Sequence, residues 1–312
     1  LYTMEVIGNN LWIGSYQSAG WNSNSDISSL EGSTDNWTSW ELDSGDIPGG
    51  YGADILVCDE IIHFAIGRLS WFGNQGGVAR FDLADHDNDG ITSEWIDPLT
   101  DGGNNGLSDD DPRALACDDA NRILYVGFDT TGVGIDRFNY NTESFLPTLT
   151  SADGVSEDLI FPGGMLHDGN LLLSAHQYDN TGGISRIVTS GTSVSSGQVL
   201  SPGMDGCSIV RVPANTPTYA IGRSGQTTGL NRVDMLDSTG LIASGFDELA
   251  GLSSGRVVEF ASNSTHVWVA STFDSNSFFA TSILQGEIIQ NGSVRWEYGY
   301  NLLDDDIINS MH

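Results

Sequence analysis

The sequence contains no lysine, and its eleven basic residues, all of them arginine, stand against 42 acidic ones. The resulting net charge of −31 at pH 7 repels nucleic-acid phosphates and anionic lipid headgroups. The composition therefore predicts that the protein binds no nucleic acid. Two explanations of the acidity remain open: solubility in a saline setting, or a specifically cationic partner.

Cysteine is also scarce, and Cys58, Cys117 and Cys207 occur in no CxxC or Cys/His metal spacing. Three scattered cysteines are too few for a disulfide scaffold. Cys58 and Cys117 occupy the same place in two successive repeats, ILVCDE and ALACDD. Equivalent positions of neighbouring units are expected to lie too far apart to bridge. We therefore expect all three cysteines to be buried small apolar residues.

Long apolar runs are missing as well, since no stretch approaches the roughly 18 residues that a membrane-spanning helix needs. The chain shows no signal peptide. We expect no membrane insertion within this segment. The sequence opens at Leu1 in the middle of a strand-like pattern, from which we expect a processed product or part of a longer chain.

Glycine is abundant, with 39 residues, and Ser, Thr, Asn and Asp fill much of the rest. This composition suits many short strands joined by tight turns. One motif recurs, an apolar pair or triplet followed by a small residue and a polar turn, as in LWIGS, FAIGR, LYVGF, LLLSA, YAIGR and VWVAS. The small residues stand at positions 14, 67, 127, 174, 222 and 270, at intervals of 53, 60, 47, 48 and 48. Such a period, with about four strands in each unit, is typical of propeller blades.

We predict an all-β fold, a β-propeller of four-stranded antiparallel blades with six complete blades and the start of a seventh. The chain is expected to form a single propeller region over 1–312. The expected blades are 1–50, 51–104, 105–153, 154–203, 204–252 and 253–301, and the next begins at 302–312. Both ends carry the pattern of a first strand, from which we expect the polypeptide to continue.

The LWIGS strand and its downstream partner, such as Gly77–Phe81 with the pattern G-[VIL]-x-R-[FIV], resemble the repeats of two-component-regulator propellers. The lead-ins Gly106–Ser108, Gly154–Ser156 and Gly251–Ser253 are similar to those of that family. The resemblance covers nearly the whole chain. It implies a propeller fold and an extracellular sensor domain, but it implies little about activity because propellers host many functions.

The strongest chemical motif is the acidic run between the third and fourth strands of the second blade. Oxygen ligands at positions 1, 3 and 5, glycine at 6 and a carbonyl at 7 are how a tight loop wraps Ca²⁺. Ile96 at the twelfth position departs from an EF-hand. We expect a structural Ca²⁺, with an empty solvated turn as the alternative. The expected ligands are Asp85, Asp87, Asp89, Ile91, Ser93 and Glu94.

Two further acidic runs, Asp109–Asp111 and Asp304–Asp306, lack this spacing, and we predict solvated acidic loops. Three N-glycosylation sequons begin at Asn36, Asn263 and Asn291. They identify a glycoprotein only if the chain is secreted from a cell that glycosylates.

A ligand-binding face is expected where the loops between second and third strands gather with the inter-blade linkers. Aromatic and planar polar side chains in these loops suit stacking on sugars or gripping a peptide. The alternative is that the aromatic rings pack beneath their own loops. The candidate residues are Tyr16, Trp21, Arg68, Trp71, His176, Tyr178 and Arg223.

Catalytic motifs are absent from the sequence, which has no GxSxG, no HExxH and no Cys/His nucleophile arrangement. We therefore predict that the protein is not an enzyme. We expect an extracellular or cell-surface propeller that acts as a ligand-binding, sensor or protein-interaction module, with a protein or glycan partner or by self-association. One alternative is a structural component of a surface layer, sheath or filament, and another is a propeller enzyme that acts on polysaccharide.

Overall fold

The computed structural model describes most of the chain in short segments. These are residues 3–14, 26–32, 36–41, 47–68, 75–84, 95–102, 106–177, 182–200, 205–213, 217–223, 232–237, 239–246, 257–272, 280–288, 294–296 and 300–301. The chain divides into two compact units. Unit 1 is Leu1–Thr150 with Gly191–Ser193, and unit 2 is Ser151–Ser190 with Val194–His312.

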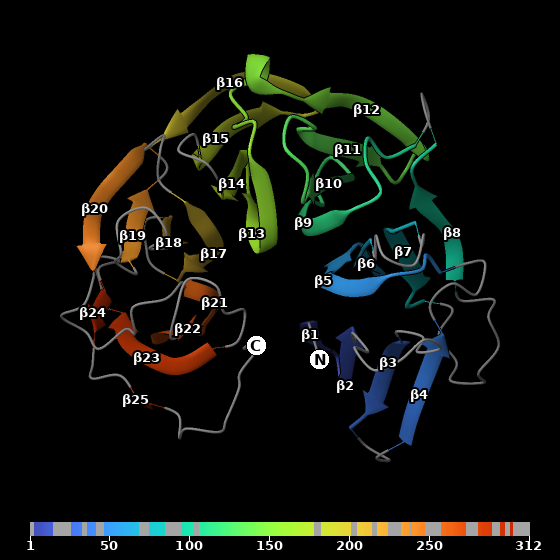
Figure 1. Ribbon diagram of the computed structural model, residues 1–312, viewed down its shortest axis with the longest axis horizontal. Helices are drawn as coiled ribbons and strands as arrows, with labels where there is room; N and C mark the ends of the chain where they lie inside the picture. The colour runs from blue at the N-terminus through green and yellow to red at the C-terminus, as the bar shows by residue number, and fades with distance from the viewer. Residues whose placement is uncertain are drawn as a thin grey trace. The chain divides into compact units, whose positions relative to one another are not determined.

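Unit 1 contains three four-stranded antiparallel sheets, in each of which the strands follow the order of the chain (Figure 1). Sheet 1 comprises β1 (Thr3–Ile7), β2 (Asn10–Gly14), β3 (Asp26–Glu31) and β4 (Asn36–Glu41). Sheet 2 comprises β5 (Tyr51–Cys58), β6 (Ile61–Gly67), β7 (Gly77–Asp82) and β8 (Trp95–Thr100). Sheet 3 comprises β9 (Pro112–Asp118), β10 (Ile123–Phe128), β11 (Ile135–Asn139) and β12 (Ser144–Leu149).

Unit 2 repeats the same arrangement. Sheet 4 comprises β13 (Leu159–Asp168), β14 (Leu171–Gln177), β15 (Gly183–Ser190) and β16 (Ser193–Leu200), and sheet 5 comprises β17 (Gly206–Val212), β18 (Thr218–Arg223), β19 (Arg232–Asp237) and β20 (Gly240–Phe246). Sheet 6 comprises β21 (Val257–Ser262), β22 (His266–Thr272), β23 (Ala280–Ile288) and β24 (Val294–Trp296), and β25 (Tyr300–Asn301) also pairs with β23.

The predicted six complete four-stranded sheets are thus confirmed, while the predicted start of a seventh at 302–312 lies outside the described residues. The helical content of the described segments is a short 3₁₀ turn, Ser151–Asp153. None of these segments holds a helix with the length and apolar character needed to cross a membrane.

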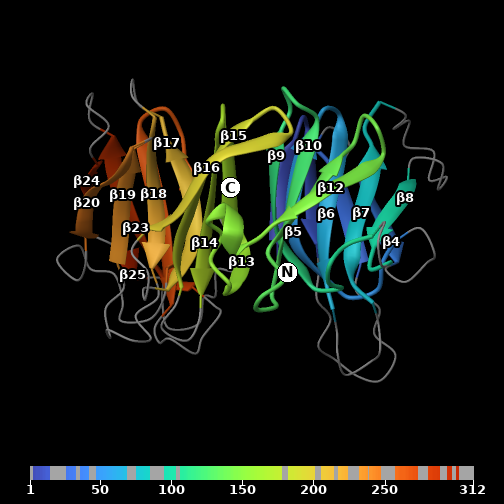
Figure 2. The same ribbon diagram turned by 90° about the horizontal axis from the view of Figure 1, so that it is seen from above.

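The second strand of sheet 2 is largely apolar because this sheet buries both of its faces. In β6, Phe64 and Ile66 join a core cluster with Trp12 of sheet 1, whereas Ala65 joins a second cluster with Val126 of sheet 3. Successive side chains of a strand point to opposite faces, so an uninterrupted apolar run is required where both faces pack. Figure 2 shows β5, β6 and β7 side by side in sheet 2.

The recurring small residue of the motif is explained by close packing at the end of the second strand. A Cβ atom on Gly67 would lie 2.6 Å from Cζ of Tyr51, and one on Gly222 would lie 2.5 Å from Cγ1 of Val257. Contacts this short are not tolerated by real side chains. The motif therefore requires a small residue where a side chain from another strand packs against the second strand.

The arginine of the third-strand motif has a structural role in at least two sheets. Arg80 is buried, donates through Nε and Nη2 to the carbonyl of Asp97 in β8, and pairs through Nη1 with Glu143 of sheet 3. Arg137 donates in the same way to the carbonyl of Pro147 in β12, and through Nη1 to the carbonyl of Thr192 in the same unit. A guanidinium offers several donors in one plane, which suits it to such a clamp.

The structure corrects the prediction for two of the three cysteines, because Cys58 and Cys117 form a disulfide between sheets 2 and 3. The two residues are not equivalent in the ladders. Cys58 pairs with Ile61 as the last pair before a two-residue turn, whereas Cys117 pairs with Leu124, one pair before the end at Asp118. A shift of one residue turns a side chain to the opposite face of its sheet, so the two sulfur atoms point toward each other.

Cys207 matches the prediction, since it is buried in β17 with 3% of its surface exposed and forms no disulfide in the described part of the chain.

Candidate functional site

The up-and-down order of the strands brings two kinds of loop to one end of each sheet. A chain that runs up β5, down β6, up β7 and down β8 places the loop between the second and third strands beside the linker to the next sheet. We call this the linker end. In unit 1, Arg68 follows β6 there, Asp129 follows β10, and the linker Gly106–Asp111 leads into β9.

A cluster of charged side chains occupies the linker end of sheets 2 and 3. Arg68 exposes 42% of its side chain, and its Nη1 lies 3.0 Å from Oδ1 of Asp110. Its backbone N–H donates to Oδ1 of Asp111 at 2.9 Å. The backbone N–H of Asp111 donates in turn to Oδ1 of Asp109. Linker and loop are thereby held together by charge-assisted hydrogen bonds.

Arg113 anchors this charged cluster from beneath. Its Nε lies 3.0 Å from Oδ1 of Asp111, its Nη2 lies 2.5 Å from Oδ2 of Asp129, and its Cζ lies 4.7 Å from the centre of the Tyr51 ring. The Asp129 N–H donates to the Asp111 carbonyl at 3.0 Å. Asp111 is 8% exposed, so the prediction of a solvated loop for Asp109–Asp111 is wrong for Asp111.

The electrostatics of the charged cluster favour a partner that donates hydrogen bonds. Four carboxylates, Asp109, Asp110, Asp111 and Asp129, surround two guanidinium groups. Burial raises the pKa of Asp129 against the opposing effect of Arg113, and burial likewise raises the pKa of Asp110 against Arg68. Partly desolvated carboxylates of this kind gain from hydroxyl or ammonium donors that replace the lost water.

Of the seven residues predicted for the ligand face, Arg68 belongs to the charged cluster. Tyr16, Trp21, Trp71 and Tyr178 lie outside the described residues. His176 and Arg223 are buried, with 0% and 2% exposure, and the prediction that they face a ligand is wrong.

His176 instead completes a buried hydrogen-bond network in sheet 4. Its Nδ1 donates to the carbonyl of Asp158 at 2.8 Å, and its Nε2 lies 2.8 Å from the hydroxyl oxygens of both Ser174 and Ser185. Because a carbonyl oxygen only accepts, Nδ1 must carry a proton. Burial lowers the pKa of His176 to about 4, although the bond to Asp158 opposes the shift.

Arg223 pairs with a buried carboxylate of its own sheet. Its Nε donates to Oδ2 of Asp234 at 2.7 Å, and Asp234 is fully buried. In the ladder Asp234 stands opposite Ile221, whereas Gly77 stands opposite the corresponding Ile66 in sheet 2. FAIGR and YAIGR thus look alike, yet only in the second is the residue opposite the isoleucine an aspartate, which holds the arginine inside.

Sequence reasoning missed most of the charged cluster. Asp111 and Arg113 stand on either side of Pro112, the first residue of β9, whereas Asp129 follows β10 and Tyr51 opens β5. The available signal was the position of each charge directly before or after an apolar strand at the linker end.

The predicted calcium ligands Asp85, Asp87, Asp89, Ile91, Ser93 and Glu94 lie outside the described residues. Their loop connects β7, which ends at Asp82, to β8, which begins at Trp95, as predicted. Among the sequons, Asn263 is exposed in the turn between β21 and β22, where its Oδ1 accepts from the N–H groups of Thr265 and His266. Asn291 lies outside the described residues, as does the side chain of Asn36.

No family model matches the chain, and no curated protein matches it. Solved structures do resemble it. Kuenenia stuttgartiensis hydrazine synthase aligns with a TM-score of 0.62 at 12% identity, over 90% of this chain and 74% of that one. The β-propeller domain of Cps50 (Swd1) from Myceliophteria thermophila aligns with a TM-score of 0.54 at 11% identity, over 83% and 75%.

The chain is a β-propeller. Its sheets 1 to 6 are accordingly blades 1 to 6. A third structural neighbour is PorZ, an essential bacterial surface component of the type-IX secretion system of Porphyromonas gingivalis, with a TM-score of 0.54 at 11% identity. This chain spans 42% of PorZ, and 97% of this chain is covered.

The comparison also corrects the prediction that this protein is not an enzyme. Hydrazine synthase carries the name of an enzyme and shares the fold at a TM-score of 0.62. The absence of familiar hydrolase and protease motifs is therefore no ground for excluding catalysis in this fold. At 12% identity the likeness shows the fold alone.

Proposed function

We propose that this propeller is a binding module of the cell surface or extracellular space that holds a protein or glycan partner at its linker end. The observation that carries the proposal is the charged cluster, in which Arg68 is 42% exposed above the anchored carboxylates of Asp111 and Asp129. A rigid polar patch with donors and acceptors fixed by ion pairs is what oriented recognition of a polar partner needs.

Several observations support an extracellular setting. A disulfide such as Cys58–Cys117 persists mainly in oxidising compartments. The sequon asparagine Asn263 is exposed. PorZ, a surface component, shares the fold, and the repeat pattern resembles the sensor propellers of two-component regulators.

The proposed binding end can be tested by charge reversal. Arg68→Glu would remove the exposed guanidinium and break the ion pair that orients Asp110, so partner binding should weaken at least about tenfold, the equivalent of about 1.4 kcal/mol. The matched control is Arg122→Glu. Arg122 is 46% exposed and pairs with Asp59, but it lies in the turn between β9 and β10, at the opposite end of blade 3.

A glycan array and a panel of labelled surface-protein ectodomains would supply the ligand, and titration of both variants would follow. Equal binding by the wild type and Arg68→Glu, or equal losses in both variants, would contradict a site at the linker end. Regular self-assembly of the purified wild type without any ligand would instead favour a structural component of a surface layer.

We also propose that the loop from Asp85 to Glu94 holds one structural Ca²⁺. The spacing of its carboxylates supports this, and so does its place between β7 and β8, opposite the linker end. Bound Ca²⁺ would stabilise the fold by about 2.7 kcal/mol at a hundredfold excess over Kd. Asp87→Ala should lower the melting temperature in millimolar Ca²⁺ and change little in chelator.

Asp305→Ala is the matched control for this calcium prediction, because Asp305 belongs to an acidic run without the ligand spacing. Calorimetric scans of both variants and the wild type would decide the matter. Identical melting of the wild type in Ca²⁺ and in EDTA would rule the ion out.

A further inference from the structure

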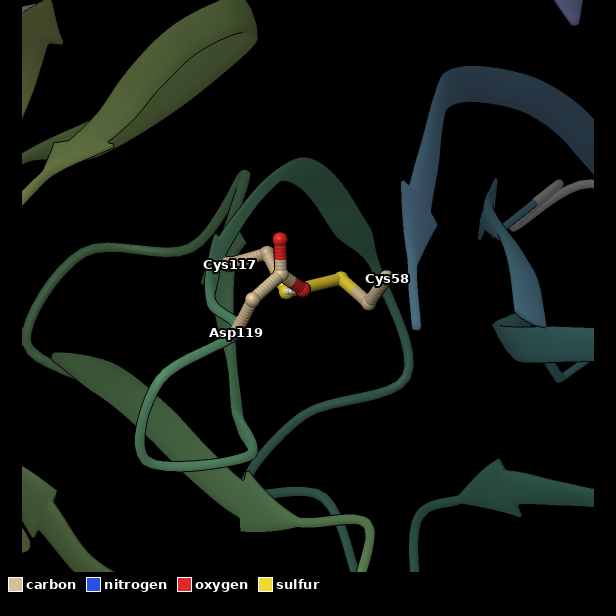
Figure 3. Close-up of side chains that lie close together, drawn as sticks. All are labelled: Cys58, Cys117 and Asp119. Atoms are coloured by element: carbon tan, nitrogen blue, oxygen red, sulfur yellow. Dashed lines mark hydrogen bonds between the residues drawn. A yellow bond between two sulfur atoms is a disulfide. The ribbon is translucent and has the colours of Figure 1, made fainter. Parts of the chain in front are cut away.

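Three metal-ligating side chains meet at the interface of sheets 2 and 3. The sulfur atoms of Cys58 and Cys117 and a carboxylate oxygen of Asp119 lie within 4.8 Å of one another. Asp119 Oδ1 is 3.1 Å from Sγ of Cys117. Figure 3 shows the Asp119 carboxylate beside the two sulfur atoms. Among the described residues this is the group whose side chains suit a metal ion.

The surroundings of this group orient its carboxylate. The hydroxyl of Tyr140 donates to Oδ1 of Asp119 at 3.3 Å and lies 3.9 Å from Sγ of Cys117. The guanidinium of Arg122 lies 6.0 Å from the centre of the Tyr140 ring. Outer partners of this kind fix a ligating carboxylate in a single orientation.

Burial falls off across the group, since Cys58 is buried, Cys117 is partly buried and Asp119 is exposed. An incoming reductant or cation therefore approaches from the side of Asp119. The Cα atoms of the two cysteines are 6.1 Å apart, which lies within the range of a disulfide.

We propose that Cys58, Cys117 and Asp119 form a two-state site. In the oxidised state it is the disulfide that joins sheets 2 and 3. In the reduced state it binds one thiophilic divalent cation, such as Zn²⁺, through two thiolates and the Asp119 carboxylate.

The chemistry of the exchange balances with a dithiol as the reductant. The dithiol gives two electrons and two protons to the Cys58–Cys117 bond, which becomes two thiols, and the dithiol becomes a cyclic disulfide. The cation then displaces both thiol protons into solvent, and a water molecule takes the fourth ligand position.

The ligand set separates this site from the acidic loop at Asp85–Glu94. Thiolates are soft ligands that select Zn²⁺ over Ca²⁺ and Mg²⁺, whereas the loop offers oxygen ligands alone. Because the three ligands come from sheets 2 and 3, the bound cation would also hold these sheets together after the disulfide is broken. The site would therefore cross-link sheets 2 and 3 under both oxidising and reducing conditions.

The test uses the full chain and Co²⁺, whose tetrahedral thiolate complexes absorb visible light. Unfolded without reductant, the protein should show one reactive thiol, Cys207, and after reduction it should show three. The folded, reduced protein, freed of reductant under anaerobic conditions, should bind one equivalent of Co²⁺ with this absorption. Zn²⁺ should displace the Co²⁺.

Three variants control the assignment. Cys117→Ser should abolish the Co²⁺ absorption, whereas Cys207→Ser should leave it unchanged. Because Cys117→Ser removes the cross-link and can impair folding, Asp119→Asn is the second probe, with an expected loss of Co²⁺ affinity of about tenfold or more. Three reactive thiols before reduction, no visible absorption with Co²⁺, or unchanged affinity in Asp119→Asn would each overturn the proposal.

Discussion

Replacing His63 with leucine should raise the free energy of unfolding at neutral pH by about 1–3 kcal/mol, and the same replacement of His176 should lower it by a similar amount. Both rings are fully buried. The opposite signs follow because the ring nitrogens of His176 are hydrogen-bonded and those of His63 are not, within the described segments. Each histidine is therefore a control for the other.

Neither ring nitrogen of His63 has a hydrogen-bond partner within the described segments. Its neighbours are Leu56 and Arg80 across the ladder and the ring of Tyr140 at 6.3 Å. Leucine would remove two unsatisfied polar atoms and add apolar contact. At His176, leucine would leave the hydroxyls of Ser174 and Ser185 and a carbonyl without this partner, which costs free energy in a buried setting.

The same pair predicts a loss of stability in acid. Burial, and second to it the charge of Arg80, lower the pKa of His63 to about 3, while burial lowers the pKa of His176 to about 4. Below pH 6.5 the unfolded chain takes up protons that the folded protein refuses. Each histidine therefore removes about 1.4 kcal/mol per pH unit as the pH falls from 6.5 toward its folded pKa.

Urea denaturation between pH 4 and pH 8 would measure both effects. Each leucine variant should show a shallower decline of stability in acid than the wild type, by about 1.4 kcal/mol per pH unit. A stabilised His176→Leu, a destabilised His63→Leu, or unchanged acid slopes would show that the hydrogen bonds and burial do not act as described.

Breaking the Cys58–Cys117 cross-link should lower the free energy of unfolding by about 4 kcal/mol, because the disulfide closes a long loop in the unfolded chain. The two cysteines are 59 residues apart, and closure entropy rises with the logarithm of that separation. Cys117→Ala and reduction of the wild type in the presence of a chelator should have the same effect. Reductant should not destabilise Cys117→Ala further.

Cys207→Ala is the control for this second prediction, since Cys207 is buried but forms no disulfide in the described chain. Its stability should keep the full dependence on reductant. Urea titrations with and without reductant give the comparison. A reductant effect of the same size in Cys117→Ala would mean that another process causes the loss.

The repeated motif was enough to predict the architecture of the chain. Alternating apolar residues and small motif residues are local signals, and they predicted six four-stranded units from a period near 48. Arg80 and Arg137 carried the family resemblance, and the structure shows why that arginine recurs, as a donor to the carbonyl of its own fourth strand. The charged cluster required residues from three segments, whose meeting no local pattern encodes.

The sequence by itself determined the strands, their order and the number of units, because these depend on side-chain alternation and turn chemistry within each repeat. Only the tertiary structure decided whether residues at matching positions of two repeats have the same environment. The turn after Cys58 has two residues, and the turn after Asp118 has four. Cys58 therefore stands in the last pair of its ladder and Cys117 in the pair before the last, so their side chains leave opposite faces of their sheets and meet. Arg223 is buried because Asp234, opposite Ile221, pairs with it. Arg68 is exposed, and the residue opposite Ile66 in its sheet is a glycine. Register between strands, which is set by turn length and packing, made both choices.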